Sequence, residues 1–220
     1  MNKLIISFCA LLMPLCANAQ VEELFNEPMS KVERQKALKE SLISQNLPEE
    51  NGKVVLRYST DIPGISKNEL YSLLGYWCEK RFEREAQRSE WPENNFFKNI
   101  MYSAVKQADR KEGKIKCQGA EEIIVTKKTF VMNWAEFFYT LDITVTDGHI
   151  DVVISNIYYV LDAETDRAKL TAEEFVSNKA IVSGRGRFLK NAAKYRVETI
   201  KLFKNLLKEI DYVAKSKAKK

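Results

Sequence analysis

The 220-residue sequence has little of the residues that most often build catalytic and metal centres. Histidine occurs once, at position 149, and glycine only eight times. The hydrolase motifs G-x-S-x-G and H-E-x-x-H do not occur, and Gly184-Arg185-Gly186 lacks the lysine and the Ser or Thr that complete a phosphate loop. We therefore expect no catalytic residue, no metal site and no cofactor.

Long apolar runs are missing as well, apart from one at the N-terminus. Lys3 precedes an apolar stretch over residues 4–15, and Ala17-Asn18-Ala19 has the small-x-small pattern of a cleavage site. This order is typical of a secretory signal peptide of residues 1–19, with the mature chain starting at Gln20. We therefore expect an exported protein, in the periplasm or at the cell surface.

Two other interpretations fit the N-terminus less well. A transmembrane anchor needs about 20 apolar residues, and the run over residues 4–15 is shorter. A lipid-attachment cysteine follows a small residue, whereas Cys9 and Cys16 follow Phe8 and Leu15. No later segment is apolar enough to span a bilayer, so we expect no transmembrane segment in the mature chain.

Cysteine is scarce in the mature chain, where Cys78 and Cys117 remain. Two distant cysteines and one histidine are too few for a structural zinc site, which takes four Cys or His ligands. An exported protein with two cysteines can form one disulfide. Cys78 lies on the apolar side of a predicted helix and Cys117 shares a strand face with Ile115, so the pair could meet across a helix–sheet interface. Two buried free thiols are the alternative.

Basic charge is concentrated at the C-terminal end. The net charge of +5 becomes +4 without residues 1–19, which hold one basic and no acidic residue. Residues 187–220 hold eleven basic and three acidic residues, a charge of +8, so the mature chain before them carries about −4. This asymmetry favours contact with polyanions or anionic lipid, with Lys201, Lys204 and Lys208 as the anion-facing residues. A solvated helix face with a lysine tail is the alternative.

Two helices are predicted in the N-terminal half by capping boxes, in which a serine and a glutamate three residues later satisfy the first amides of a helix. The first helix follows Ser30 and covers residues 31–44. A strand is expected over residues 53–58. The second helix follows Ser66, and its apolar stripe predicts burial against a core: Leu70, Leu73, Leu74, Trp77, Cys78 and Phe82.

The clearest strand signal is a hairpin over residues 139–161, with Asp147-Gly148 as its turn. Asp-Gly favours a type I′ turn, in which both central residues have positive φ. This turn pairs Thr146 with His149 and places three apolar pairs on one buried face: Val145–Ile150, Ile143–Val152 and Leu141–Ile154. Past Ser155 both faces become apolar, which suggests a β-bulge or a strand end that is covered on both sides.

Weaker patterns predict the other elements. Residues 100–108 and 114–120 have the composition of strands, whereas residues 123–134 are ambiguous between a strand and an irregular insertion. A short helix is expected after Thr171, where Glu174 completes a capping box. A long helix is expected over residues 187–210, with an apolar stripe flanked by lysines: Leu189, Ala193, Val197, Ile200, Phe203, Leu207 and Ile210.

Two short segments carry a resemblance to a known family. They are Ile65-Ser66-Lys67-Asn68-Glu69-Leu70-Tyr71, which leads to Trp77, and the hairpin Ala108-Asp109…Gly113-Lys114-Ile115…Gly119. With the signal peptide, they resemble a family of exported bacterial proteins whose domain of unknown function has a TATA-box-binding-protein-like (TBP-like) fold. The similarity covers residues 53–161 and the terminal helix. It implies an α+β fold, in which helices pack on one face of a curved antiparallel sheet, and it implies no catalytic residue.

These patterns together divide the chain into four parts. We expect a signal peptide over residues 1–19, a leader with a helix over residues 20–52, one TBP-like domain over residues 53–212 and a basic tail over residues 213–220.

Three classes of function stay open. The first, which we favour, is a non-enzymatic binding module of the bacterial envelope, whose partner is an envelope protein or a surface ligand. The second is a peripheral binder of anionic membranes or polyanions through the basic C-terminal helix. The third is an enzyme without a recognisable motif, in which His149 could act as a general base; a solvent-exposed residue beside a turn is the plainer interpretation. An exported protein does not meet promoter DNA, so we expect no nucleic-acid partner despite the name of the fold.

Overall fold

A computed structural model describes residues 47–87, 103–128, 131–161, 168–182 and 189–217 of the chain. The expected signal peptide, the expected helix over residues 31–44 and the last three residues of the basic tail lie outside the described residues. Within the described ranges, no helix is both long enough and apolar enough to cross a membrane.

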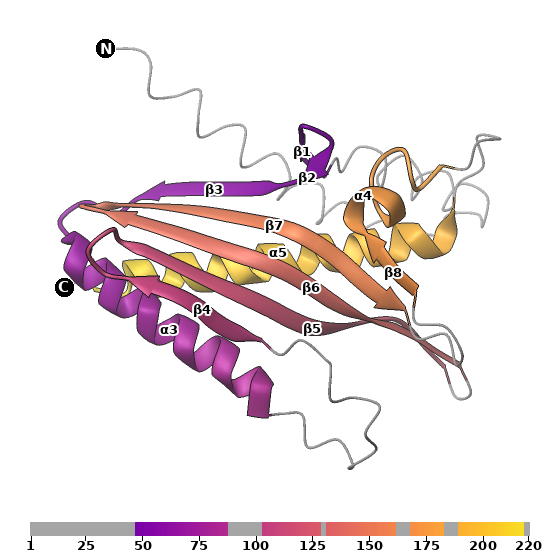
Figure 1. The fold of residues 1–220 in the computed structure, drawn as a ribbon, viewed down its shortest axis with the longest axis horizontal. Coiled ribbons are helices and arrows are strands. Elements are labelled where there is room, and N and C mark those ends of the chain that lie inside the picture. The colour runs from indigo at the N-terminus through magenta and orange to yellow at the C-terminus, as the bar shows by residue number, and fades with distance from the viewer. Residues whose placement is uncertain (1–46, 88–102, 129–130, 162–167, 183–188, 218–220) are drawn as a thin grey trace, which may run out of the picture.

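The centre of the fold is an antiparallel sheet in the order β3-β7-β6-β5-β4, with β8 paired to the far half of β7 (Figure 1). The strands are β3 (Leu56–Asp61), β4 (Ala104–Asp109), β5 (Lys114–Lys128), β6 (Val131–Thr146), β7 (His149–Leu161) and β8 (Ala168–Thr171). A separate hairpin of β1 (Glu49–Glu50) and β2 (Lys53–Val54) precedes β3. The long strands β5, β6 and β7 form a meander, so the middle of the sheet is built from neighbours in sequence.

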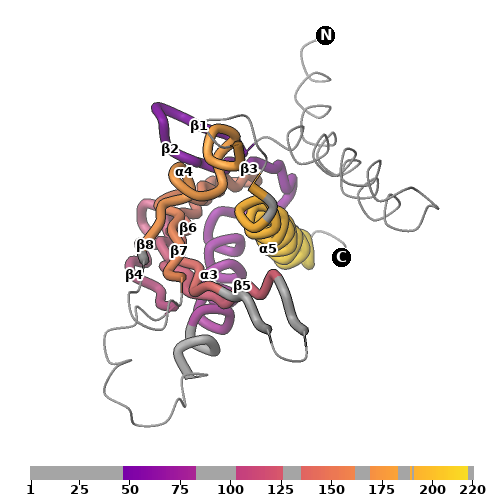
Figure 2. Tube along the Cα trace, turned by 90° about the vertical axis from the view of Figure 1, so that its right-hand side faces the viewer, coloured from indigo at the N-terminus to yellow at the C-terminus, as the bar shows by residue number. Residues whose placement is uncertain are grey.

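Two long helices cover one face of this sheet. α3 (Lys67–Gln87) contacts β4, β5 and β6, and α5 (Lys190–Lys215) contacts β5 and α3. Figure 2 shows both helices on the same side of the strands. The short α4 (Ala172–Phe175) lies against β2 and β8. The fold is therefore α+β, with helices packed on one face of an antiparallel sheet, as the sequence predicted.

Alternation along β6 determines which face is covered. The odd-numbered residues from Ala135 to Val145 are buried, and the even-numbered residues are half-buried, with Phe138 as a buried exception. Phe137 lies at the centre of an aromatic cluster, with its ring centroid 5.2 Å from that of Tyr159 and 5.5 Å from that of Phe203. The side chains that point towards the helices therefore form the hydrophobic core.

Tyr139 lies across the neighbouring strand at a glycine. Its cross-strand partner is Gly119, and a Cβ at that position would lie 2.2 Å from the Tyr139 ring. Glycine leaves the space in which the ring packs. Beyond it, the Tyr139 hydroxyl donates a hydrogen bond to Glu121, and Glu121 forms an ion pair with Arg81 of α3 at 3.0 Å. This line of contacts joins β6, β5 and α3.

The predicted register of the β6–β7 hairpin is confirmed. Thr146 pairs with His149, and the three apolar pairs fall opposite each other as expected: Val145–Ile150, Ile143–Val152 and Leu141–Ile154. The bulge expected past Ser155 is present as well, because the register shifts between Phe138 and Thr140 and Asn156 has a φ of 51°.

The predicted type I′ turn at Asp147-Gly148 is wrong. Gly148 has a positive φ of 67°, but Asp147 does not have a positive φ. The reason is a set of contacts from the link between β3 and α3. The carboxylate of Asp147 accepts a hydrogen bond from the Lys67 amide at 2.8 Å, the Gly148 amide donates to the Ile65 carbonyl at 2.9 Å, and the Gly148 carbonyl accepts from the Ile62 amide at 2.7 Å. These three tertiary hydrogen bonds outweigh the local preference of Asp-Gly.

The other strand and helix predictions differ from the structure mainly in their bounds. Of the ambiguous residues 123–134, those that the structure describes belong to the ends of β5 and β6, which stay paired with a shift of register between Ile124 and Thr126. The capping box at Thr171 and Glu174 is confirmed at the start of α4. α5 begins three residues later and ends five residues further on than the expected helix over residues 187–210.

Candidate functional site

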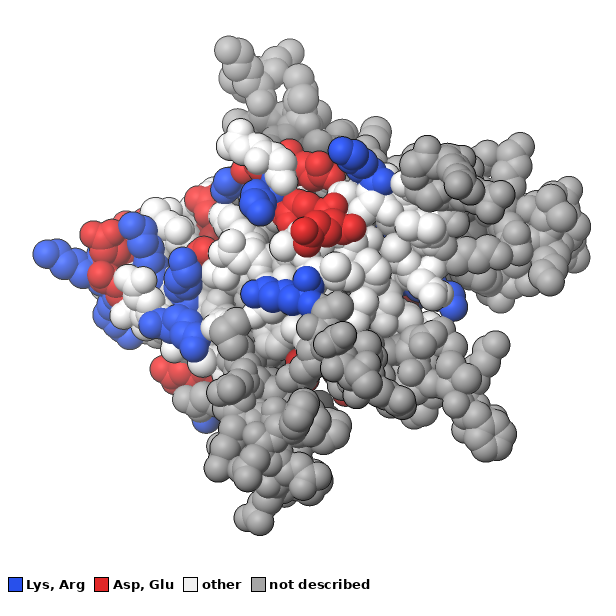
Figure 3. Space-filling model, turned by 45° about the vertical axis from the view of Figure 1, so that its right-hand side comes forward, with Lys and Arg blue, Asp and Glu red and all other residues white. Residues whose placement is uncertain are grey.

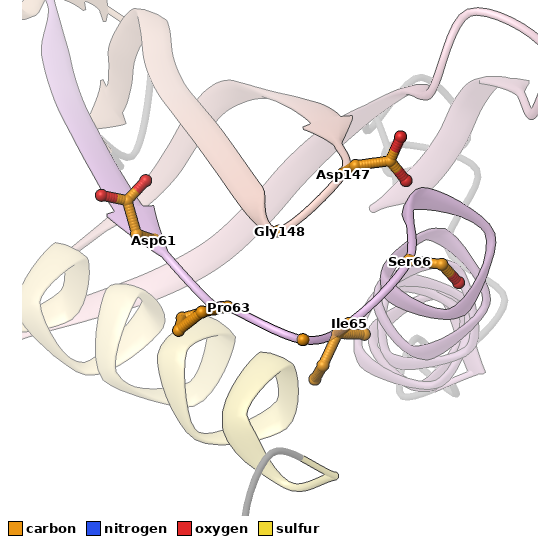
Figure 4. Close-up of a pocket in the computed structure, with 7 residues that line it drawn as sticks. Asp61, Pro63, Ile65, Ser66, Asp147 and Gly148 are labelled. Atoms are coloured by element: carbon orange, nitrogen blue, oxygen red, sulfur yellow. The ribbon is translucent and has the colours of Figure 1, made fainter.

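A shallow hollow lies where the link between β3 and α3 meets the β6–β7 turn (Figure 4). It has a volume of about 740 Å³ and is lined by Asp61, Pro63, Gly64, Ile65, Ser66, Asp147 and Gly148. The hydrogen bonds from Ile62, Gly148 and Lys67 described above fix the two segments against each other. Gly64 and Gly148 both have positive φ, which glycine adopts without steric cost. The hollow is therefore a structured surface feature.

The polar groups of the hollow do not converge. Figure 4 shows the carboxylates of Asp61 and Asp147 well apart and pointing in different directions. The Asp147 carboxylate already accepts the first amide of α3 at Lys67, which compensates the positive end of the helix dipole. Ser66 completes this start of the helix, since its hydroxyl accepts from the Glu69 amide at 3.4 Å. Asp147 and Ser66 therefore act as helix caps.

A cluster of polar side chains lies beside the hollow, around His149. The Nδ1 of His149 is 2.6 Å from a carboxylate oxygen of Asp61, and its Nε2 is 3.1 Å from the Ser59 hydroxyl and 3.3 Å from a carboxylate oxygen of Asp151. Ser59 and Asp61 come from β3, and His149 and Asp151 come from β7. The antiparallel pairing of the two strands brings these four residues together.

The two aspartates favour the protonated form of His149. The hydrogen bond to Asp61 raises the pKa of the imidazole, partial burial acts against this rise, and Asp151 adds to it. The side chain of Asp61 is 79% exposed and that of His149 is 33% exposed. Because water screens such a cluster, we expect a modest effect of its charge on stability.

The contacts Ser59–His149–Asp61 have the order of a serine-hydrolase triad, in which the histidine takes the serine proton and the aspartate orients the histidine. Here the Asp151 carboxylate competes for the same nitrogen as Ser59, and this favours an imidazolium that cannot accept a proton. The site also faces solvent, whereas acyl transfer depends on amide donors placed around the developing oxyanion. Among the residues that the structure describes, no group of three or more His, Cys, Asp or Glu is placed to hold a metal ion.

The His149 cluster is one end of the outer face of the sheet, the face that points away from α3 and α5. Figure 3 shows basic and acidic side chains intermixed on this side of the molecule. The charges lie in opposite pairs: Arg57–Glu50 at 2.7 Å, Lys114–Glu112 at 2.8 Å and Lys116–Asp142 at 3.5 Å. This face therefore has no strong excess of either charge within the described strands.

An aromatic pair lies at the opposite end of the outer face. Phe138 of β6 stacks on Tyr158 of β7, with ring centroids 4.8 Å apart and an interplanar angle of 11°. The ammonium group of Lys169 lies 4.0 Å from the centroid of the Tyr158 ring, a distance at which a cation interacts favourably with a ring. The outer face thus combines polar side chains with a small aromatic patch.

The three predicted anion-facing lysines lie on α5 but do not act as one group. Lys201 pairs with Glu198 at 3.1 Å. Lys204 is half-buried, and burial lowers the pKa of its ammonium, with the charge of Lys208 lowering it further. Lys204 and Lys208 are therefore close enough to repel each other, while the charge of Lys201 is partly compensated. Their role towards an anion stays a prediction.

One basic residue of the C-terminal segment belongs to the interior. Arg196 is fully buried, and its guanidinium donates a hydrogen bond to the Val176 carbonyl at 3.2 Å. Burial lowers the pKa of Arg196 to about 10. The sequence count of surface charge included this residue, because helical spacing alone does not reveal that the loop after α4 covers it.

Cys78 and Cys117 meet as the sequence analysis anticipated. Both side chains are fully buried, Cys78 on α3 and Cys117 on β5. The structure has them as free thiols that are close enough for Cys117 to affect the pKa of Cys78. This contact and burial both raise the pKa of Cys78, so its thiol is a poor nucleophile in the folded chain. A bond between them stays a prediction.

Sequence reasoning missed the partners of His149 and the role of Asp147. Asp151 lies two residues from His149 on the same strand, but Asp61 reaches the cluster only because β3 pairs with β7, which lies about 90 residues further along the chain. No local pattern reports a pairing over that distance. The same holds for Asp147, whose cap position on α3 depends on the packing of two loops.

Residues 58–160 match the profile of a protein family described as a domain of unknown function (DUF4468) with TBP-like fold. A solved structure of a DUF4468 family protein from Bacteroides ovatus ATCC 8483 is similar to this chain, with a TM-score of 0.63, 20% identity, and coverage of 76% of this chain and 90% of that one. A TBP-like protein from Parabacteroides distasonis ATCC 8503 has a TM-score of 0.61, 18% identity, and coverage of 77% and 97%. No curated protein matches the sequence. At these identities the two structures establish the fold.

Proposed function

Since residues 58–160 are a domain of the family with unknown function and a TBP-like fold, we propose that the protein is an exported binding module of the bacterial envelope that does its work without catalysis. The observation that carries this proposal is the outer face of the sheet. In the described part of the chain both long helices pack on the other face, and the outer face extends along β3, β7, β6 and β5. The export part of the proposal comes from the signal-peptide pattern of residues 1–19.

The chemistry of the outer face favours a protein partner with a mixed, polar surface. Its charges are balanced in pairs such as Arg57–Glu50 and Lys116–Asp142, so a strongly charged partner of either sign gains little there. Balanced charges on both sides of an interface give specificity and orientation. Tyr158, half-buried and stacked on the buried Phe138, adds an aromatic contact at one end, and aromatic residues often contribute most to binding.

The experiment compares binding by two kinds of surface variant. The full chain, tagged at its C-terminus, is cross-linked in the cell envelope and recovered, once unchanged and once with Ser59→Arg and Thr144→Arg on the outer face. The matched control is Asn205→Arg, which adds the same side chain at an exposed position of α5. Circular dichroism and thermal unfolding check that each variant folds.

We expect a partner that the unchanged chain and the Asn205→Arg variant recover and that the outer-face variant loses by at least tenfold. Equal recovery by all three, or recovery of none above background, would overturn the proposal. Recovery that depends on α5 and not on the outer face would favour the second candidate.

The second candidate is peripheral binding to an anionic membrane through α5. It is favoured by the proximity of Lys204 and Lys208, whose mutual repulsion an anionic surface would relieve. Each lysine close to such a surface contributes about 1 kcal/mol. Cosedimentation with vesicles of anionic and of neutral lipid tests it. Replacement of Lys201, Lys204 and Lys208 by Gln should abolish a salt-sensitive preference for the anionic vesicles, and no preference in the unchanged chain would exclude this candidate.

A further inference from the structure

We propose that Cys78 and Cys117 are joined by a disulfide that forms while the chain folds in an oxidising compartment and that ties α3 to the sheet. The inference rests on the export part of the proposed function, since disulfides persist outside the cytoplasm. It goes beyond the binding proposal because it concerns a covalent bond inside the core.

The geometry that supports the bond is the meeting of two layers. Cys78 lies on the face of α3 that points to the sheet, between the buried residues Leu74 and Phe82 one turn to either side. Cys117 lies on the inner face of β5, between the buried Ile115 and Gly119. Gly75, one turn before Cys78 on α3, packs against Ile115, two residues before Cys117 on β5: a Cβ at Gly75 would lie 3.9 Å from the Ile115 side chain. The same packing places Cys78 next to Cys117, whose interaction raises the pKa of the Cys78 thiol. Joining the two cysteines therefore needs a short approach of their sulfur atoms.

The folded core protects the pair from reagents. Both side chains are fully buried, so an oxidant has no access to either sulfur once α3 has packed. The bond must therefore form before or during the packing of α3. After packing, the same burial shields the disulfide from reducing agents, because exchange needs a thiolate in line with the S–S bond.

The oxidant is a disulfide, either on an exported oxidoreductase or on a small molecule such as oxidised glutathione. The thiolate of one cysteine attacks it and forms a mixed disulfide, releasing one thiol of the oxidant. The thiolate of the second cysteine then attacks the mixed disulfide, forms the Cys78–Cys117 bond and releases the second thiol. The protein loses two protons and two electrons, and the oxidant gains them as it becomes two thiols.

The first arm of the experiment tests the chemistry in vitro. The purified full chain is reduced, unfolded and refolded with a mixture of oxidised and reduced glutathione. It is then unfolded again without reductant, and its accessible thiols are blocked with an alkylating reagent. Peptide mapping under non-reducing conditions reports whether Cys78 and Cys117 are linked, and no variant is needed for this measurement.

We expect a peptide that links Cys78 to Cys117 and is lighter by two hydrogen atoms than the sum of the two reduced peptides. The bond closes a loop of about 40 residues, and such loops raise the melting temperature of a domain of this size by about 10 °C. Cys78→Ser and Cys117→Ser, as matched single variants, should show the same melting temperature in oxidising and reducing buffer. Alkylation of both Cys78 and Cys117 in the refolded, unchanged chain would overturn the bond.

The second arm tests the compartment. The full chain is expressed from its own start in a bacterium, the cells are quenched with acid, and thiols are blocked before lysis. We expect Cys78 and Cys117 to resist blocking in denaturant until a reductant is added. If Cys78 and Cys117 are linked in the refolded sample but react with the blocking reagent in the cellular sample, the cellular disulfide and the export premise are both overturned. This result would leave the binding function of the outer face to its own experiment.

Discussion

The two faces of the sheet are built from alternate residues of the same strands, yet they differ in almost every physical respect. On β6, Phe137 and Tyr139 point to the helices and are buried among aromatic rings. Asp142 and Thr144 of the same strand point outward, where Asp142 pairs with Lys116 across the strand. The inner face supplies burial of apolar area, which dominates stability, while exposed ion pairs contribute little. Substitutions on the outer face can therefore change recognition with little effect on folding.

The largest expected effect is on the inner face, at Phe137. Phe137→Ala should lower the free energy of unfolding by about 3–5 kcal/mol, because it removes a fully buried ring and leaves a cavity. Thr144→Ala, on the outer face of the same strand, should change it by no more than about 0.5 kcal/mol. Urea unfolding of both variants measures the contrast. Similar losses for the two would mean that both faces are packed.

A smaller effect is expected where β5 and β6 touch, at Gly119. Gly119→Ala should destabilise by about 1–3 kcal/mol, because its Cβ would overlap the Tyr139 ring, which is held in place by Phe82 and Phe203. The same change at Gly75 of α3 is the control. There the nearest atom lies 3.9 Å from the new Cβ, and alanine should stabilise the helix by roughly 0.5–1 kcal/mol. A lower melting temperature for Gly119→Ala and a higher one for Gly75→Ala would support this packing. An unchanged melting temperature for Gly119→Ala would contradict it.

The edge of the inner face gives the third prediction. The Tyr58 hydroxyl of β3 donates to Asp211 of α5 at 2.7 Å, and it joins the last helix to the edge strand. Tyr58→Phe should cost about 1 kcal/mol, since it deletes one partly exposed hydrogen bond. Hydrogen exchange should rise at the amides of β3 and of the last turns of α5, with little change in β5 and β6. A uniform change over the whole domain would argue against a local link.

The smallest effect is on the outer face, at His149. Its pKa is raised by Asp61 and Asp151, so the folded chain binds the proton more tightly than the unfolded chain does. The resulting stabilisation is present below pH 6.5 and is lost as the pH rises through the higher folded pKa. Stability should therefore fall slightly above pH 6.5, and His149→Gln should flatten that slope. The midpoints of urea unfolding, measured from pH 5.5 to 8.5, test this. The same dependence of the midpoint on pH in the unchanged chain and in His149→Gln would contradict it.

The features predicted well from the sequence are those that neighbouring residues determine. The register of the β6–β7 hairpin follows from a two-residue loop between alternating apolar residues, and the cap of α4 follows from Thr171 and Glu174. The meeting of Cys78 with Cys117 was anticipated because each lies on the apolar side of its element. The export signal of residues 1–19 and the helix over residues 31–44 stay predictions.

The features that sequence reasoning missed depend on contacts between distant segments. Asp147-Gly148 does not form the turn that Asp-Gly favours, because the β3–α3 link holds it. Asn51-Gly52, which joins β1 and β2, has both central residues at positive φ, 50° and 72°. The His149 cluster and the burial of Arg196 likewise need the tertiary fold. The local preference of a residue pair therefore predicts the turn type only where no distant segment forms hydrogen bonds with the turn.

β3 and β8 share the edge of β7 that lies opposite β6, and this division has a consequence for self-association. β7 is 13 residues long, but β3 pairs with its first half and β8 with its last four residues, with the bulge at Asn156 between them. The edge strands β3, β4 and β8 are only six, six and four residues long. These short edges resist the edge-to-edge pairing that leads to aggregation. At β3, β4 and β8 a partner is therefore expected to bind across the sheet and not to extend it.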